Sequence, residues 1–294
     1  MGLTPAIVVT GAGGFIGRKV LRQLASHPGR VIGLDLQPTP GDWTGDWLQG
    51  PLLRLREVPP PFMVVHLAWD MRRGDAAAQE AALADFRNML EIPGRVGLVG
   101  LGSAEEYGSA EGRLAEEMAP GPDLSAYGRA KHGALCAARE CGGRCIWLRP
   151  FLVYGEGQRG GMAIPYALLC IREGRIAEFS AGEQYRDFVH VDDVASGISA
   201  ATRTVTGLEE GECRLCNLGR GEPVKLRDVL SRLARTAGCE DRFRFGVRPM
   251  RAGEPRCQYA ATDVAQTTLG WKASIPWQEG IDRLCRAPDL QGRT

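Results

Sequence analysis

Residues 6–17 read Ala-Ile-Val-Val-Thr-Gly-Ala-Gly-Gly-Phe-Ile-Gly, and this stretch decides the fold. Its apolar first part predicts a buried strand, and the amphipathic pattern over 15–26 predicts a helix directly behind the glycine loop. Glycines at these positions permit a tight turn and a close approach of the backbone to a pyrophosphate, and the helix N-terminus offers it free N–H groups. The sequence therefore predicts a dinucleotide-binding site, whose glycines are Gly11, Gly14 and Gly17.

A carboxylate closes the second predicted strand, since Asp35 lies 18 residues after Gly17. An acidic side chain there can accept hydrogen bonds from the adenosine ribose and would repel a 2′-phosphate, which favours NAD over NADP. NADP stays open, because Arg18 and Lys19 flank the loop and could pair with such a phosphate. Asp46 is a second candidate, as a neighbour of the adenine, although an aspartate there could equally be solvated.

Short apolar runs alternate with helical patterns through the first half of the chain, which indicates parallel strand–helix–strand units. We expect an α/β fold, a Rossmann-type doubly wound parallel sheet with a smaller C-terminal substrate-binding lobe and a cleft at the carboxyl ends of the strands. The predicted strands are 6–10, 30–36, 62–68, 95–101 and 144–148, and the predicted helices are 15–26, 75–91, 125–140, 165–173 and 224–237. The expected domains are 1–150, with a returning segment at about 186–219, and mainly 151–294 for the substrate lobe.

Composition and charge exclude several classes of protein. The 294 residues are 44% hydrophobic and 24% charged, with a formal net charge of +1, so nothing favours disorder or a nucleic-acid partner. No apolar run approaches the length of a membrane span, and the first is too short for a signal peptide. Nine cysteines without regular spacing fit reduced thiols in a cytoplasmic protein. Cys213 and Cys216 are expected to lie in a strand, and we predict no metal site.

A tyrosine and a lysine near the start of a predicted helix form a candidate catalytic pair. Tyr127 and Lys131 are one helical turn apart and therefore share a face. A nearby ammonium and a positive nicotinamide ring would stabilise the phenolate, which lets the hydroxyl exchange a proton with a substrate hydroxyl at neutral pH. Ser103 follows the fourth predicted strand and can hydrogen-bond the same substrate oxygen.

With these motifs the sequence resembles the NAD-dependent epimerase/dehydratase family, the extended branch of the short-chain dehydrogenases/reductases. The resemblance implies that the dinucleotide site also includes Phe15, Ile16, Leu67 and Ala68. It implies a homodimer formed through the helices at 75–91 and 125–140. Further matching motifs are His66-Leu67-Ala68, Leu148-Arg149-Pro150, Tyr154-Gly155, residues 186–194, Asn217-Leu218-Gly219, residues 251–254 and Leu269-Gly270-Trp271.

The resemblance also implies a nucleotide-diphosphate sugar as substrate. Arg186 and Arg251 would grip its pyrophosphate, which guanidinium groups bind bidentately, and Glu254 would bind its ribose. Phe179 is placed to stack on the base, or it packs in the core. Trp69 stands where a small residue usually follows His-Leu-Ala, and it would either narrow the sugar pocket or pack under the loop. The segment from Phe188 to Val194 is expected to have a structural role, as in this family. The chain departs from the family at Leu152, where an asparagine often contacts the substrate phosphate.

The residues after Ser103 discriminate between the reactions of such enzymes. Ala104 lacks the acid that 4,6-dehydration needs to protonate a departing hydroxyl, whereas Glu105 remains available as a base. We favour NAD-dependent 4-epimerisation through a transient 4-keto sugar. A 4-ketoreductase that uses exchangeable NAD(P)H is the alternative, and a dinucleotide sensor without catalysis is disfavoured by the intact Ser103, Tyr127 and Lys131.

Overall fold

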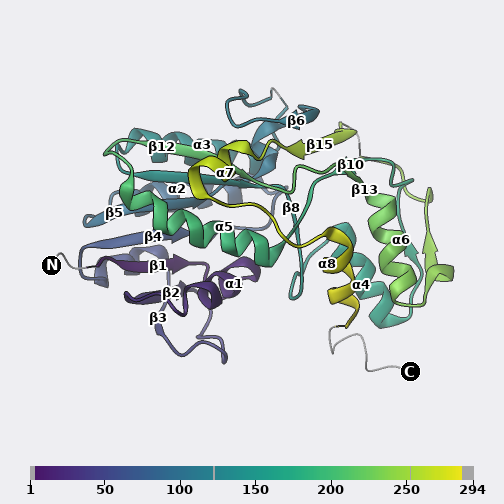
Figure 1. Ribbon diagram of the computed structural model, residues 1–294, viewed down its shortest axis with the longest axis horizontal. Coiled ribbons are helices and arrows are strands. Elements are labelled where there is room, and N and C mark those ends of the chain that lie inside the picture. The colour runs from purple at the N-terminus through teal and green to yellow at the C-terminus, as the bar shows by residue number, and fades with distance from the viewer. Residues whose placement is uncertain (1–3, 122, 252, 287–294) are drawn as a thin grey trace.

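One large parallel sheet carries the fold (Figure 1). The computed structural model describes residues 4–121, 123–251 and 253–286. Its seven-stranded sheet has the order β12-β7-β5-β4-β1-β2-β3, so the chain reverses direction of travel between β1 and β4, as in a doubly wound fold. The strands are β1 (Ala6–Thr10), β2 (Val31–Asp35), β3 (Asp46–Gln49), β4 (Phe62–His66), β5 (Arg95–Leu101), β7 (Cys145–Pro150) and β12 (Cys213–Leu218).

Helices cover both faces of this sheet. Helix α1 packs beside α5 on one face, and α2 packs beside α3 on the other (Figure 1). Successive strand residues point to opposite faces, so Val9 joins the apolar cluster under α1 and α5 while Val8 joins the cluster under α2 and α3. The helices are α1 (Phe15–Leu24), α2 (Ala76–Leu90), α3 (Ala126–Glu140), α4 (Ala163–Glu173), α5 (Val191–Thr204), α6 (Leu226–Thr236), α7 (Asp263–Leu269) and α8 (Trp277–Arg286).

The C-terminal lobe gathers around α4, α6 and α8, at the right of Figure 1. It has its own apolar core, which includes Tyr154, Phe188 and Phe243. Short strands frame it as a four-stranded sheet of order β13-β10-β15-β6 and as the pairs β11-β8 and β14-β9. These are β6 (Gly112–Leu114), β8 (Leu152–Tyr154), β9 (Ala177–Glu178), β10 (Tyr185–Arg186), β11 (Phe188–His190), β13 (Val224–Lys225), β14 (Phe243–Arg244) and β15 (Cys257–Ala260).

A buried carboxylate ties the lobe to the large sheet. Asp187, only 1% exposed, accepts the backbone N–H groups of Arg220 and Gly221 at 2.8 Å and that of Ala260 at 3.1 Å. The first two donors follow β12 and the third ends β15, so one side chain holds three segments that are distant in sequence. Burial raises the pKa of Asp187, while the three N–H groups oppose that rise.

The structure confirms the predicted fold class and the strands and helices of the first half, with ends that shift by a few residues. Cys213 and Cys216 lie in β12, as expected. The sequence analysis missed β3, because its four residues include no continuous buried run. Helix α5 is capped by His190, whose side chain accepts the N–H of Asp192.

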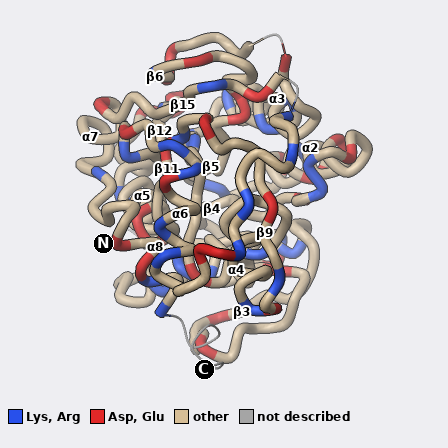
Figure 2. Tube along the Cα trace, turned by 90° about the vertical axis from the view of Figure 1, so that its right-hand side faces the viewer, with Lys and Arg blue, Asp and Glu red and all other residues tan. Residues whose placement is uncertain are grey.

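The surface agrees with the nearly balanced charge of the chain. Figure 2 shows Lys and Arg interspersed with Asp and Glu over the face that it presents. Within the described residues, no helix combines the length and the apolar character needed to cross a membrane.

We predict that Gly17→Ala disrupts the loop. A Cβ at Gly17 would lie 2.2 Å from the Gly11 carbonyl oxygen and 2.8 Å from the Ala12 Cα, so the helix must move away from the loop. We expect a loss of about 1–3 kcal/mol in the free energy of unfolding. NAD affinity should fall at least about tenfold, since the phosphate cradle shifts.

Urea denaturation and calorimetric titration with NAD measure the two effects. Gly41→Ala is the matched control, because a Cβ at Gly41 meets nothing within 4 Å. That control should leave both quantities unchanged. Wild-type affinity and stability in Gly17→Ala would contradict the role assigned to this glycine.

Candidate active site

The loops at the carboxyl edge of the large sheet carry the site. The glycine loop follows β1, Asp35 ends β2, Leu67 and Ala68 follow β4, and Ser103 follows β5. Gly11 adopts φ of 65°, and a Cβ there would lie 2.7 Å from the backbone nitrogen of Ala68. Gly14 caps α1 without a side chain, so the N–H groups of the first turn are presented to the loop. This backbone geometry fits a pyrophosphate.

Asp35 lies directly against the glycine loop. Its Oδ2 accepts the N–H of Gly13 and its Oδ1 accepts the N–H of Gln37, both at 2.9 Å. Each carboxylate oxygen has a second lone pair, so the side chain can also accept from ribose hydroxyls. Arg18, considered above as a partner for a 2′-phosphate, pairs instead with Asp42 at 3.3 Å.

The structure contradicts the expectation that Asp46 neighbours the adenine. Asp46 begins β3 in register with Ile32, whereas Asp35 is in register with Gln49 at the other end of that strand. Asp46 is therefore separated from the carboxyl edge by three residues, or about 10 Å of strand. It pairs with Arg30 at 2.5 Å on the amino side of the sheet.

Ser103, Tyr127 and Lys131 come together where β5 ends. Tyr127 and Lys131 are buried on one face of α3. The Lys131 Nζ donates to the carbonyl oxygen of Leu101, the last residue of β5, at 2.7 Å. Ser103 caps the short 3₁₀ turn that follows, and its Oγ accepts the N–H of Glu105 at 3.1 Å. Strand β5 thus positions both the serine and the lysine relative to the tyrosine.

Burial moves both titratable groups toward their neutral forms. It raises the pKa of Tyr127 to about 12, against the lowering effects of Arg73 and of a hydrogen bond with Ser103. It lowers the pKa of Lys131 to about 7, against the raising effect of Glu106. The free protein therefore keeps the phenol protonated at neutral pH, and Tyr127 needs additional positive charge beside it to act as a base.

The sequence analysis missed an arginine on the same tyrosine. The guanidinium carbon of Arg73 lies 4.6 Å from the centroid of the Tyr127 ring. Its Nη1 donates to Glu105 Oε1 at 2.7 Å, and Glu105 Oε2 accepts from Ser125 Oγ at 2.7 Å. Glu105, which the sequence offers as a base, is therefore held by one donor at each carboxylate oxygen in the free protein. Arg73 lies in the irregular loop before α2, where no periodic pattern could reveal its contact.

The sequence analysis also missed Glu106, which is fully buried beside Ser103. Its Oε1 accepts the N–H of Ser103 at 2.9 Å and the indole N–H of Trp147 at 3.0 Å. Its Oε2 accepts from Arg149 Nε at 3.0 Å. The acidic residue after Glu105 was visible in the sequence, but only the packing shows that it points inward.

Trp69 lies against Lys131. The Lys131 Nζ is 3.8 Å from the Trp69 ring centroid, a cation–π contact. The indole N–H donates to Gln79 Oε1 at 2.9 Å, and the ring packs against Phe86. A large side chain is thus held in one orientation beside Lys131.

The structure brings some of the predicted substrate residues together and leaves others apart. Arg186 Nη2 donates to Glu254 Oε1 at 2.8 Å, so these two contact one another. Arg251 is exposed in the loop before β15. Of the two alternatives for Phe179, the structure agrees with core packing: the side chain is 6% exposed and its ring lies 5.7 Å from that of Phe245.

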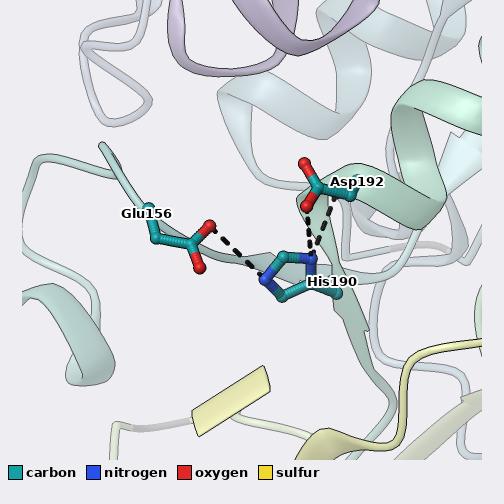
Figure 3. Close-up of side chains that lie close together, drawn as sticks. All are labelled: Glu156, His190 and Asp192. Atoms are coloured by element: carbon teal, nitrogen blue, oxygen red, sulfur yellow. Dashed lines mark hydrogen bonds and ion pairs between the residues drawn. The ribbon is translucent and has the colours of Figure 1, made fainter. Parts of the chain in front are cut away.

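Figure 3 shows a charged cluster of Glu156, His190 and Asp192. The His190 Nδ1 accepts the N–H of Asp192 at 3.2 Å, so the ring proton is on Nε2, which lies 3.6 Å from Glu156 Oε2. The Lys19 Nζ contacts Asp192 at 2.9 Å and Glu156 at 3.4 Å. A lysine ammonium therefore supplies the positive charge between the carboxylates, and Lys19 is turned toward this cluster rather than toward a 2′-phosphate.

A glycine loop at the switch point of a doubly wound sheet, with Ser103 and the buried Tyr127 and Lys131 beside it, defines a short-chain dehydrogenase/reductase of the extended type. Residues 7–219 match the model of the NAD dependent epimerase/dehydratase family, and the chain belongs to this family.

The similar proteins act on activated sugars where their names state an activity. CDP-abequose synthase of Salmonella muenchen is 24% identical, over 95% of this chain and 96% of its own. The uncharacterized protein MJ1055 of Methanocaldococcus jannaschii is 30% identical over 143 residues, a match that spans 48% of this chain and only 42% of that protein. The solved structure of MoeE5 in complex with UDP-glucuronic acid and NAD has a TM-score of 0.82 at 27% identity, over 94% of this chain and 96% of that one.

We predict that His66 makes stability depend on pH. The ring is 1% exposed, its Nδ1 lies 3.0 Å from Thr10 Oγ1, and burial, aided by Lys131, lowers its pKa to about 3. An unfolded histidine has a pKa of about 6.5, so between these values the unfolded chain binds the additional proton. The free energy of unfolding should therefore fall as the pH drops from about 6.5 toward 3.

Urea denaturation from pH 8 to pH 4 measures this dependence. Because one proton corresponds to about 1.4 kcal/mol per pH unit, His66→Gln should have a shallower slope than wild type by up to that amount below pH 6. The two slopes should agree above pH 7. Equal slopes down to pH 4 would contradict the neutral, buried state of His66.

Proposed function

We propose that this protein is an NAD-dependent 4-epimerase of nucleotide-diphosphate sugars, which acts through a transient 4-keto sugar. The observation that carries the proposal is the buried Tyr127 hydroxyl, held with Ser103 and Lys131 at the edge of the sheet that also bears the glycine loop. A proton-transfer group and a dinucleotide cradle at one edge suit reversible oxidation of a sugar hydroxyl.

The residues at this edge fit NAD. The α1 N-terminus and its glycines would hold the pyrophosphate, and the Asp35 carboxylate would accept from the adenosine ribose. When bound, NAD supplies an acceptor and donor of hydride at the sugar carbon. The residues proposed to line its site are Gly11, Gly14, Phe15, Ile16, Gly17, Asp35, Leu67, Ala68, Tyr127 and Lys131.

This chain's own residues handle the proton. Tyr127 takes the proton of the 4-hydroxyl while the C–H bond at the same sugar carbon breaks. It returns that proton after the keto sugar has turned to present its other face for the return of hydride. Ser103 hydrogen-bonds the same oxygen and Lys131 supplies positive charge to the phenolate. Ala104 carries no acid for a departing hydroxyl, which argues against dehydration.

Arg186 and Arg251 are proposed to bind the diphosphate of the substrate, and Glu254 its ribose. In the free protein Arg186, on β10, already pairs with Glu254, in the loop before β15. The two side chains are therefore close enough to contact one bound molecule. MoeE5, whose complex contains UDP-glucuronic acid, supports a substrate of this class. We further propose a homodimer through α2 and α3, which pack together on one face of the sheet.

A second function is a 4-ketoreductase of nucleotide-linked 4-keto-6-deoxysugars that uses NAD(P)H. The ring of Trp69, fixed by Gln79 and Lys131, favours it. Epimerisation requires room for the keto sugar to turn, whereas reduction needs only one bound face. CDP-abequose synthase, which matches along nearly the whole of both chains, supports a nucleotide-linked sugar as substrate for either reaction.

We predict that Tyr127→Phe lowers turnover by about 10²–10⁴-fold, because the group that exchanges the proton is removed. Calorimetric titration should show NAD affinity within a few-fold of wild type, since the ring remains. Tyr259→Phe, on β15, is the control and should retain full activity. Full activity in Tyr127→Phe would refute the catalytic assignment.

We predict that the purified protein retains NAD. Denaturation followed by chromatography should release about one NAD per chain, and turnover should need no added dinucleotide, because an epimerase regenerates its cofactor in each cycle. An empty protein that turns over only with added NADPH would overturn the epimerase in favour of the reductase.

A further inference from the structure

Arg73 lies on the face of the Tyr127 ring, although it comes from a different part of the chain. Its guanidinium carbon is 4.6 Å from the ring centroid, within the range of a cation–π contact. Glu105 fixes this position through the 2.7 Å ion pair, and Ser125 in turn holds Glu105. The Arg73 and Glu105 side chains are each 37% exposed, so solvent screens the pair only in part.

The catalytic lysine supplies only part of the charge that a phenolate needs here. The Lys131 Nζ is 5.7 Å from the Tyr127 ring centroid and is occupied by the Leu101 carbonyl and the Trp69 ring. Burial lowers its pKa to about 7, so near neutral pH a large fraction of Lys131 is uncharged in the free protein. A guanidinium stays charged at every pH at which the protein is folded.

The charged groups that face Tyr127 are Arg73, Glu105, Glu106 and Lys131. The two glutamates oppose the phenolate, and both are paired with arginines, Glu105 with Arg73 and Glu106 with Arg149. Among the neighbouring charges Arg73 has the largest lowering effect on the pKa of Tyr127, second in size only to the raising effect of burial. Removing Arg73 would also leave Glu105 beside the ring without its cation.

We propose that Arg73 is a positioning residue: its guanidinium, held over the ring by Glu105, supplies a permanent positive charge that stabilises the Tyr127 phenolate during proton transfer. The inference rests on the proposed role of Tyr127 as the proton-transfer group. It adds a second cation to the Ser103–Tyr127–Lys131 group and gives the two hydrogen bonds of Glu105 a role, since they hold Arg73 over the ring.

The test compares Arg73→Gln with wild type, both saturated with NAD. Tyrosine labelled with ¹³C at Cζ reports ionisation of the phenol directly, and Tyr127→Phe identifies the signal among the six tyrosines. Loss of one nearby positive charge should raise the titration midpoint of Tyr127 by about one pH unit. Turnover near pH 7 should fall about tenfold, with the acidic limb of the pH–rate profile displaced upward by the same amount.

Two further variants separate charge from structure. Arg73→Lys keeps the charge and should restore at least half of the displacement. Arg72→Gln is the matched control: Arg72 is 69% exposed and pairs with Asp70 and Asp75, away from the ring. It should leave both the titration of Tyr127 and the pH profile unchanged. Thermal unfolding of all three variants verifies that they are folded.

The titration needs no sugar substrate, so its outcome is independent of the reaction assigned to the protein. An unchanged Tyr127 midpoint in folded Arg73→Gln would overturn the proposal. An unchanged midpoint with a raised KM would show instead that Arg73 binds substrate. A displaced midpoint without any effect of Tyr127→Phe on turnover would uphold the electrostatic contact and refute the proposed function.

Discussion

The active site depends on one buried carboxylate, that of Glu106. Its oxygens accept the backbone N–H of Ser103, which follows β5, and side-chain N–H groups of Trp147 and Arg149 on β7. One carboxylate thus joins the end of β5 to β7. An unpaired charge in this position would cost several kcal/mol, and removing one partner of a buried pair costs about 3–5 kcal/mol. The loop after β5 therefore has little freedom to leave the position in which Glu106 is satisfied.

The catalytic geometry follows from that constraint. The end of β5 supplies both Ser103 and the Leu101 carbonyl that holds Lys131, so fixing this end fixes two of the three side chains proposed to be catalytic. Helix α3 packs against the 3₁₀ turn that follows Ser103. The approach is so close that a Cβ at Gly128 would lie 2.5 Å from the Glu105 carbonyl oxygen. Tyr127 is thereby placed between a rigid strand end and the loop that carries Arg73.

How much the sequence could predict depends on how local each signal is. The glycine loop, the strands of the first half and the Tyr127–Lys131 spacing were predictable, because strand and helix periods are written in adjacent residues. Arg73 and Glu106 were not, since their roles arise from contacts between segments that are distant in sequence. Asp46 and Phe179 each kept two possible placements for the same reason: a strand register and a lobe core decide where each side chain points.

Three cations of the site already have partners before any ligand binds. Arg186 is paired with Glu254, Arg73 with Glu105, and Lys131 with a carbonyl and an indole ring. A bound diphosphate or sugar must therefore replace or share these partners, and its affinity is the difference between the new contacts and the old ones. A ligand that replaces Glu254 as the partner of Arg186 is selected by its charge. A phosphate that binds Arg186 bidentately competes well with the single oxygen of Glu254, whereas a neutral group does not. Under the proposed function, the paired charges of the free protein thus contribute to selection for an anionic, nucleotide-linked substrate.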